Sequence, residues 1–133
     1  MRILLNAPNP LAEWNDLSGG VTSELLRVEC RRSLDQHWHR KELTDTDLAN
    51  KLPRLLTFLT RFDVQPLNAS VLELASEPLP SSLGTLDAIH LATAMIYRAG
   101  QAPDERPILF ATHDRQLARA ARAMRFDVIG VPV

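Results

Sequence analysis

The sequence predicts an α/β fold in which helices pack on a sheet of parallel strands. The clearest strand is the continuous apolar run Ile108–Ala111, because strands covered on both faces in parallel sheets carry few polar residues. Helical patterns alternate with short strand patterns along the chain, which is the order that builds parallel sheets. With 133 residues, of which 45% are hydrophobic and 23% are charged, the chain has the size and composition of a single domain over residues 1–133.

The first third of the chain predicts a short helix, the end of a strand and a longer helix. The short helix would run from Leu11 to Leu17, after a proline-rich break and before a pair of glycines. Val21 and Thr22 are typical of a strand end, and Ser23 is a favoured N-cap. The helix that follows carries apolar residues at helical spacing: Leu25, Leu26, Val28, Cys30 and Leu34.

The middle of the chain predicts two further helices with a strand between them. Thr44, with Asp47 three residues later, has the pattern of a capping box before a leucine-rich helix. Pro53 lies inside this helix and predicts a kink or a division into two helices. Residues 62–66 then form a strand pattern, and Asn68 is a candidate cap for the next helix.

The last third predicts two helices and two strands. An apolar helix runs from Leu86 to about Ala99 and ends at Gly100, a residue that commonly follows helix C-termini. The apolar strand described above comes next, then a helix after Asp114. A last strand covers residues 127–131.

Three acidic residues are candidates for a shared cation site. Asp87 stands at the start of an otherwise apolar helix, where a carboxylate needs a partner, a metal or a functional reason. Asp114 follows the apolar strand, and Glu29 lies in the opening turns of its helix. Ligand sites in parallel sheets form at the carboxyl ends of strands, so these acids could converge on one crevice. Each also has a purely structural explanation: a first-turn acid for Asp87, an N-cap for Asp114, and a solvated helical ion pair for Glu29.

The net charge and the numbers of arginines and cysteines limit the possible functions of the protein. A net charge of −1 gives no overall basic signature, so nucleic-acid binding would depend on a local group of arginines. Candidates for phosphate contacts are Arg27, Arg31 and Arg115, although a solvated helical face would look the same. The single Cys30 cannot form an intrachain disulfide, and no apolar run approaches the roughly 20 residues that a membrane span needs. We therefore expect a cytoplasmic protein without membrane contact.

The histidines are weaker candidates for functional residues than the three acids. His90 follows Asp87 by three residues and is expected to be a packed or hydrogen-bonded structural residue, while His113 is a possible substrate contact. The group His37-Trp38-His39 has no further cysteine or histidine at ligand spacing, so we interpret it as a helix surface with an aromatic anchor.

Three segments resemble the PIN-domain ribonucleases, and within them the VapC-like toxins of toxin–antitoxin pairs. The segments cover residues 22–34, 86–94 and 110–121, and the acidic residues of the family fall on Glu29, Asp87 and Asp114, with Thr112 beside the last. The resemblance runs from about Arg2 to the end of the chain.

The resemblance implies a PIN-like three-layer α/β/α fold with a central parallel sheet. It also implies an endoribonuclease that depends on Mg²⁺ or Mn²⁺, with Glu29, Asp87 and Asp114 as catalytic and metal-binding residues and Thr112 in support. Carboxylates suit such hard cations, which activate water and neutralise charge during phosphodiester hydrolysis. A VapB-like antitoxin and a homodimer are the implied partners, besides RNA.

One departure from the family concerns its first strand, which normally ends in an aspartate. Either Asn6 occupies that position, or Met1 lies inside the helix that normally follows the strand. We expect the second case, in which the first strand and its aspartate are missing. A non-catalytic PIN module that binds an antitoxin or another partner is then the alternative to a nuclease. A receiver-like signalling domain is a weaker alternative, because its early aspartate and later lysine are not evident.

Overall fold

A five-stranded parallel sheet forms the centre of the computed structural model, which describes residues 2–5, 19–102 and 108–131. The strand order is β3-β2-β1-β4-β5, and every neighbouring pair is parallel. The strands are β1 (Arg2–Leu5), β2 (Gly20–Ser23), β3 (Phe62–Gln65), β4 (Ile108–Ala111) and β5 (Asp127–Ile129). The predicted parallel sheet is confirmed.

The expectation that the first strand is missing is wrong. Ile3 of β1 pairs with Gly20 on one side and with Leu109 on the other, so β1 is the central strand. An apolar run of three residues fits a strand paired along both edges, but a run this short has no periodicity that separates a strand from a helix end. Asn6 and the predicted helix 11–17 lie outside the described residues.

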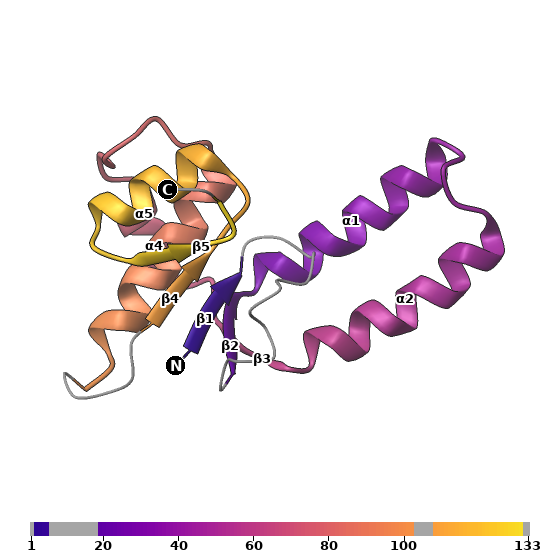
Figure 1. Ribbon diagram of the computed structural model, residues 1–133, viewed down its shortest axis with the longest axis horizontal. Helices are drawn as coiled ribbons and strands as arrows, with labels where there is room; N and C mark the ends of the chain where they lie inside the picture. Colours follow the sequence, from indigo (N-terminus) through magenta and orange to yellow (C-terminus); the bar gives the residue numbers. More distant parts are fainter. Residues whose placement is uncertain (1, 6–18, 103–107, 132–133) are drawn as a thin grey trace.

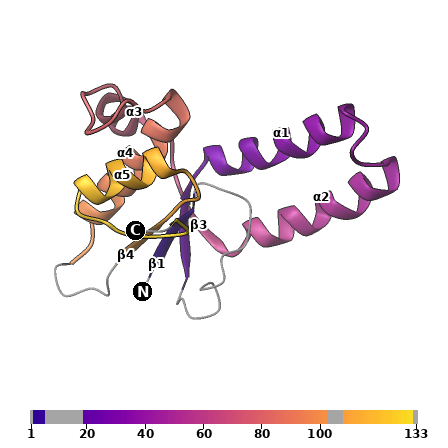
Figure 2. The same cartoon turned by 45° about the horizontal axis from the view of Figure 1, so that its top comes forward.

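Three helices pack together on one side of the sheet. Helix α4 (Thr85–Ala99) contacts β2, while α5 (Arg115–Ala123) contacts β4 and β5, and α3 (Ala69–Ala75) packs against α4 (Figures 1 and 2). Residues 88–94 of α4 are all buried, which explains the apolar character of that segment. The main core lies between these helices and the sheet and includes Val21, Leu91, Phe110, Leu117 and Phe126.

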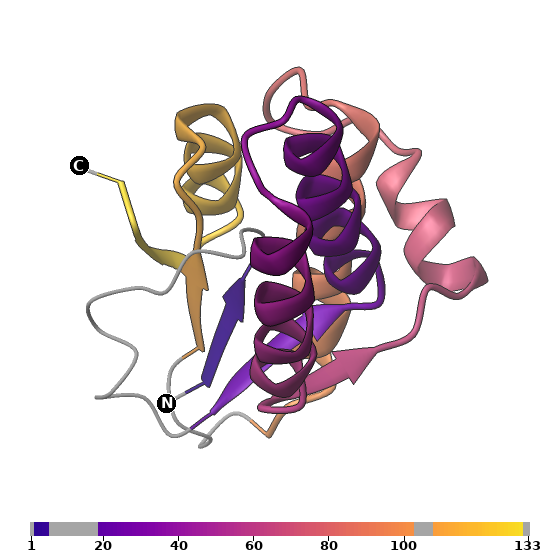
Figure 3. The ribbon, with the colours of Figure 1, turned by 90° about the vertical axis from the view of Figure 1, so that its right-hand side faces the viewer.

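Two long helices form an arm on the opposite side of the sheet. Helices α1 (Leu25–His39) and α2 (Asp45–Leu59) pack against each other, and they extend away from the strands in Figures 1 and 3. Only Leu26 and Cys30 of α1 are buried, and no residue of α2 is. The sheet therefore lies between two helical layers, as the predicted α/β/α class requires.

The predicted helix boundaries hold with one adjustment. Thr44 and Asp47 form the capping box of α2, and Asn68 caps α3 by accepting a hydrogen bond from the backbone amide of Val71. Helix α2 continues through Pro53 without a division. The N-cap of α1 is Glu24 rather than Ser23, although the Ser23 hydroxyl accepts a hydrogen bond from the Leu25 amide at 2.9 Å. In the described part of the chain, no helix has the length and apolar character needed to cross a membrane.

Candidate active site

The strand order predicts a ligand site at the carboxyl ends of β1 and β4. From β1 the chain crosses to β2, while from β4 it crosses to β5 on the other side, so the connections leave these neighbouring strands in opposite directions. Such a switch point leaves the ends of the two strands uncovered by their own connections, and ligands of parallel α/β proteins bind there. Asp114 follows β4 at this edge.

The turn after β4 fixes the position of Asp114. The Thr112 side chain is only 1% exposed, and its hydroxyl accepts a hydrogen bond from the Asp114 amide at 3.0 Å. Asp114 is the N-cap of α5, and its Oδ1 accepts a hydrogen bond from the Leu117 amide at 2.8 Å. The structural explanation of Asp114 as an N-cap is therefore confirmed, and Thr112 makes a turn hydrogen bond beside it. The cap uses one carboxylate oxygen, which leaves Oδ2 for a second task.

The end of β5 supports the same turn. The Thr112 amide donates to the Ile129 carbonyl at 3.0 Å, and His113 Nδ1 donates to the Gly130 carbonyl at 2.9 Å. Gly130 has a φ of 100°, and a Cβ at this position would lie 2.4 Å from the Thr112 carbonyl oxygen. Only glycine fits both the backbone conformation and the close approach.

Asp87 lies in the first turn of α4 and is electrostatically linked to both other acids. Its pKa is raised above the ordinary aspartate value, first by burial, then by the negative charge of Asp114 and, more weakly, by that of Glu29, while His90 acts in the opposite direction. The fold therefore brings the carboxyl groups of Glu29 on α1 and of Asp114 at the start of α5 within electrostatic range of Asp87 on α4.

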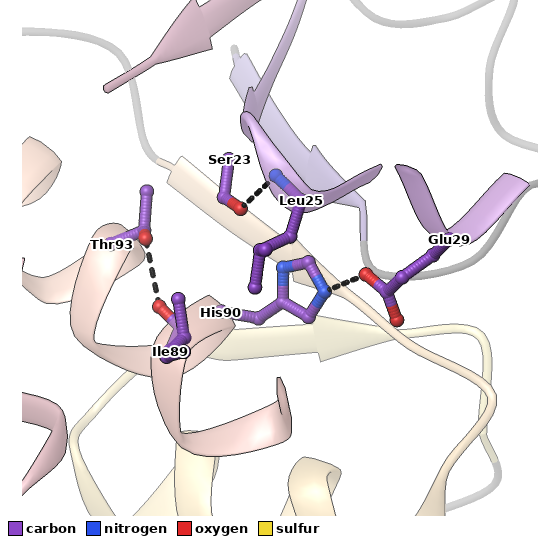
Figure 4. Close-up of polar contacts among 6 residues, drawn as sticks. All are labelled: Ser23, Leu25, Glu29, Ile89, His90 and Thr93. Atoms are coloured by element: carbon purple, nitrogen blue, oxygen red, sulfur yellow. Dashed lines mark hydrogen bonds and ion pairs between the residues drawn. The ribbon is translucent and has the colours of Figure 1, made fainter. Parts of the chain in front are cut away.

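Glu29 has a specific partner in His90. Its Oε1 lies 2.5 Å from His90 Nε2, and the His90 side chain is 4% exposed against 28% for Glu29 (Figure 4). The expectation that His90 is a packed, hydrogen-bonded histidine is confirmed. The sequence analysis did not identify Glu29, one of the three candidate acids, as the partner of His90. The position of His90 one helical turn after Asp87 was a usable signal that it lies near the candidate site.

The three acids fit a hydrated divalent cation better than a tightly coordinated one. Among residues 2–5, 19–102 and 108–131, no group of three histidines, cysteines or acids is arranged to hold a metal ion directly. The candidate donors are all carboxylate oxygens, and burial first and the charges of Asp114 and Glu29 second raise the pKa of Asp87; a cation would relieve this repulsion. Mg²⁺ keeps several of its waters and so does not need a closed protein cage. The metal site on Glu29, Asp87 and Asp114 stays a prediction.

The candidate RNA-contacting arginines are all on the surface. Arg27, Arg31 and Arg115 are exposed, the first two on α1 and the third at the start of α5. Arg27 also lines a groove of about 500 Å³ between the start of α1 and the end of α2. The groove has an apolar part formed by Leu56, Leu59 and Val64. Contact of these arginines with RNA stays a prediction.

Comparison with known families gives one match. The family model described as "PIN domain" matches residues 2–123, a range that includes β1 and all three candidate acids. No curated protein matches the chain.

Proposed function

The chain belongs to the PIN domain family, whose fold is of the nuclease type, and on this premise we propose that it is a metal-dependent endoribonuclease. The observation that carries the proposal is the position of Asp114 after β4, at the edge of the sheet where ligands bind, with Asp87 near enough that the charge of Asp114, after burial, raises the pKa of Asp87. Structural acids need not converge on one another, whereas acids that hold a cation must.

The proposed chemistry assigns a task to each residue. Glu29, Asp87 and Asp114 hold Mg²⁺ or Mn²⁺, which supplies an activated water and neutralises charge on the phosphodiester when bound. Thr112 orients Asp114 through the hydrogen bond to its amide, and the helix cap fixes one carboxylate oxygen. The exposed guanidinium groups bind the RNA backbone and position it without reading its bases: Arg27, Arg31 and Arg115.

We further propose that the protein acts as a VapC-like toxin in the cytoplasm, neutralised by a VapB-like antitoxin. The support is the likeness of the three acidic segments to that group and the groove beside Arg27, whose apolar wall suits the apolar face of a short antitoxin segment. A homodimer is part of the same proposal. The antitoxin would cover the acidic crevice and so block access of RNA.

A second candidate function rests on the residue that follows β1. The strand ends at Leu5, and the next residue in the sequence is Asn6, where the family has an aspartate. Asparagine supplies a neutral oxygen in place of a charged one, which weakens attraction for a divalent cation. A non-catalytic module that retains only partner binding is therefore the alternative outcome of the test.

The test is cleavage of a mixed RNA pool by the full chain in Mg²⁺ or Mn²⁺. We expect EDTA and Asp87→Asn each to abolish cleavage, while Glu73→Gln, which neutralises an exposed acid on α3, leaves it unchanged. Asn6→Asp should increase the rate, because it restores a fourth carboxylate. A folded protein that cleaves no RNA, with or without Asn6→Asp, would favour the binding module.

A further inference from the structure

One buried histidine contacts a candidate metal ligand without being a candidate ligand itself. We propose that His90 is a positioning residue that holds the Glu29 carboxylate in place for the divalent cation. The inference rests on the proposed nuclease function, since it concerns the same site. It assigns a role to a side chain that the proposed chemistry leaves unused.

The geometry of the pair carries the inference. Glu29 belongs to α1 and His90 to α4, so the 2.5 Å contact joins two helices that pack on different sides of the sheet (Figure 4). Helix α1 is held to the domain by few buried side chains, chiefly Leu26 and Cys30. The hydrogen bond with His90 therefore connects the Glu29 carboxylate to the buried helix α4.

The chemistry of the pair determines which atom donates the hydrogen bond and which oxygen is left for the cation. A carboxylate can only accept hydrogen bonds, so the proton lies on His90 Nε2, which donates to Glu29 Oε1. This interaction occupies one carboxylate oxygen and leaves Oε2 for the cation. Asp114 has a similar arrangement, because the Leu117 amide donates a hydrogen bond to its Oδ1. Two of the three acids therefore have one oxygen fixed by the protein.

Position along α4 strengthens the assignment. His90 lies three residues after Asp87, and residues at that spacing are neighbours on a helix surface. One face of one helix therefore supplies a carboxylate and also fixes a second carboxylate. Such outer partners of metal ligands commonly determine affinity, and their removal weakens metal binding by roughly 10- to 100-fold.

The experiment measures Mn²⁺ affinity by titration calorimetry on the full chain. We expect His90→Ala to weaken Mn²⁺ binding by roughly 10- to 100-fold. His90→Gln should recover most of that loss, because its side-chain amide can still donate to Glu29, and a role in packing alone predicts no such recovery. Thr93→Ala is the matched control, since Thr93 is buried on the same helix and its hydroxyl donates to the Ile89 carbonyl.

A measurement on the wild-type protein covers the case in which His90→Ala does not fold. Nitrogen-15 NMR of the histidine rings should identify His90 as the Nε2-protonated form, with signals that move during a Mg²⁺ titration. A His90 resonance that ignores Mg²⁺, or His90→Ala with wild-type Mn²⁺ affinity, would overturn the inference and leave the nuclease intact. A wild-type chain that neither binds Mn²⁺ nor cleaves RNA would overturn both.

Discussion

Asp87 in the first turn of α4 and Asp114 at the start of α5 share an electrostatic environment that favours the protonated form of Asp87. The pKa of Asp87 is raised by burial first and by the charge of Asp114 second. The folded protein therefore binds this proton more tightly than the unfolded chain does. Without metal, the contribution of Asp87 to stability falls as pH rises from 3.8, its ordinary value, through the raised value of the folded state.

Neutralising Asp87 should stabilise the metal-free protein. At neutral pH we expect Asp87→Asn to raise the melting temperature in EDTA by about 1–4 °C, because it removes a half-buried charge that lies near two like charges. At about pH 3 the difference should vanish, since Asp87 is protonated in both states there. Thermal melts followed by circular dichroism across this pH range check the prediction, and a lower melting temperature at neutral pH would contradict it.

Asp114 combines a structural and a proposed metal-binding task, and two substitutions separate them. Asp114→Asn keeps an oxygen that caps α5, so stability should change by less than about 0.5 kcal/mol while Mn²⁺ affinity falls. Asp114→Ala should lose the affinity and also about 1 kcal/mol of stability. Urea unfolding and calorimetric titration of both variants measure these effects. Unchanged Mn²⁺ binding in Asp114→Asn would remove Asp114 from the metal site.

Gly130 should tolerate no side chain. We expect Gly130→Ala to destabilise the protein by about 2 kcal/mol, because it combines a positive φ with a Cβ that meets the Thr112 carbonyl oxygen at 2.4 Å. Gly19→Ala is the control, since a Cβ there meets nothing within 4 Å. Urea denaturation compares the two variants. Equal unfolding free energies would show that the turn after β4 can shift.

The thiol of Cys30 should be unreactive in the folded protein. Burial, together with the nearby charge of Glu29, raises the pKa of Cys30 to about 11. At pH 8 its thiolate fraction is then roughly 200-fold lower than that of an exposed cysteine, which has a pKa of about 8.5. A disulfide reagent should modify the native protein slowly and the urea-unfolded protein rapidly. Comparable rates in the two states would contradict the burial of this side chain.

Local signals made most of the fold predictable. The helix caps at Thr44, with Asp47, and at Asn68 accept hydrogen bonds from backbone amides within a few residues. Their patterns can therefore be identified without knowledge of the tertiary structure. Helix α4 was clear because most of its residues between Asp87 and Arg98 are apolar. Strand β1 was not, since only its pairing with β2 and β4 distinguishes three apolar residues from the end of a helix.

The candidate site was predictable only in part. The acids could be selected from the resemblance, and the position of His90 one helical turn after Asp87 is a local signal. The hydrogen bond between His90 and Glu29, however, joins residues far apart in the sequence, so no local pattern identifies Glu29 as the partner. The same applies to Gly130, whose constraint comes from the carbonyl of Thr112 in the turn after β4. Local rules describe caps and periodicity, whereas these contacts exist only after the sheet has formed.

The central position of β1 makes assembly of the sheet depend on the order of synthesis. Leu109 is added about 100 residues after its partner Ile3, which takes roughly 5–20 s at ordinary elongation rates. Until then β1 can pair on one edge alone, and Asp114 has not yet been made. A nascent chain therefore cannot bring Glu29, Asp87 and Asp114 together until the segment that carries Leu109 and Asp114 has been made.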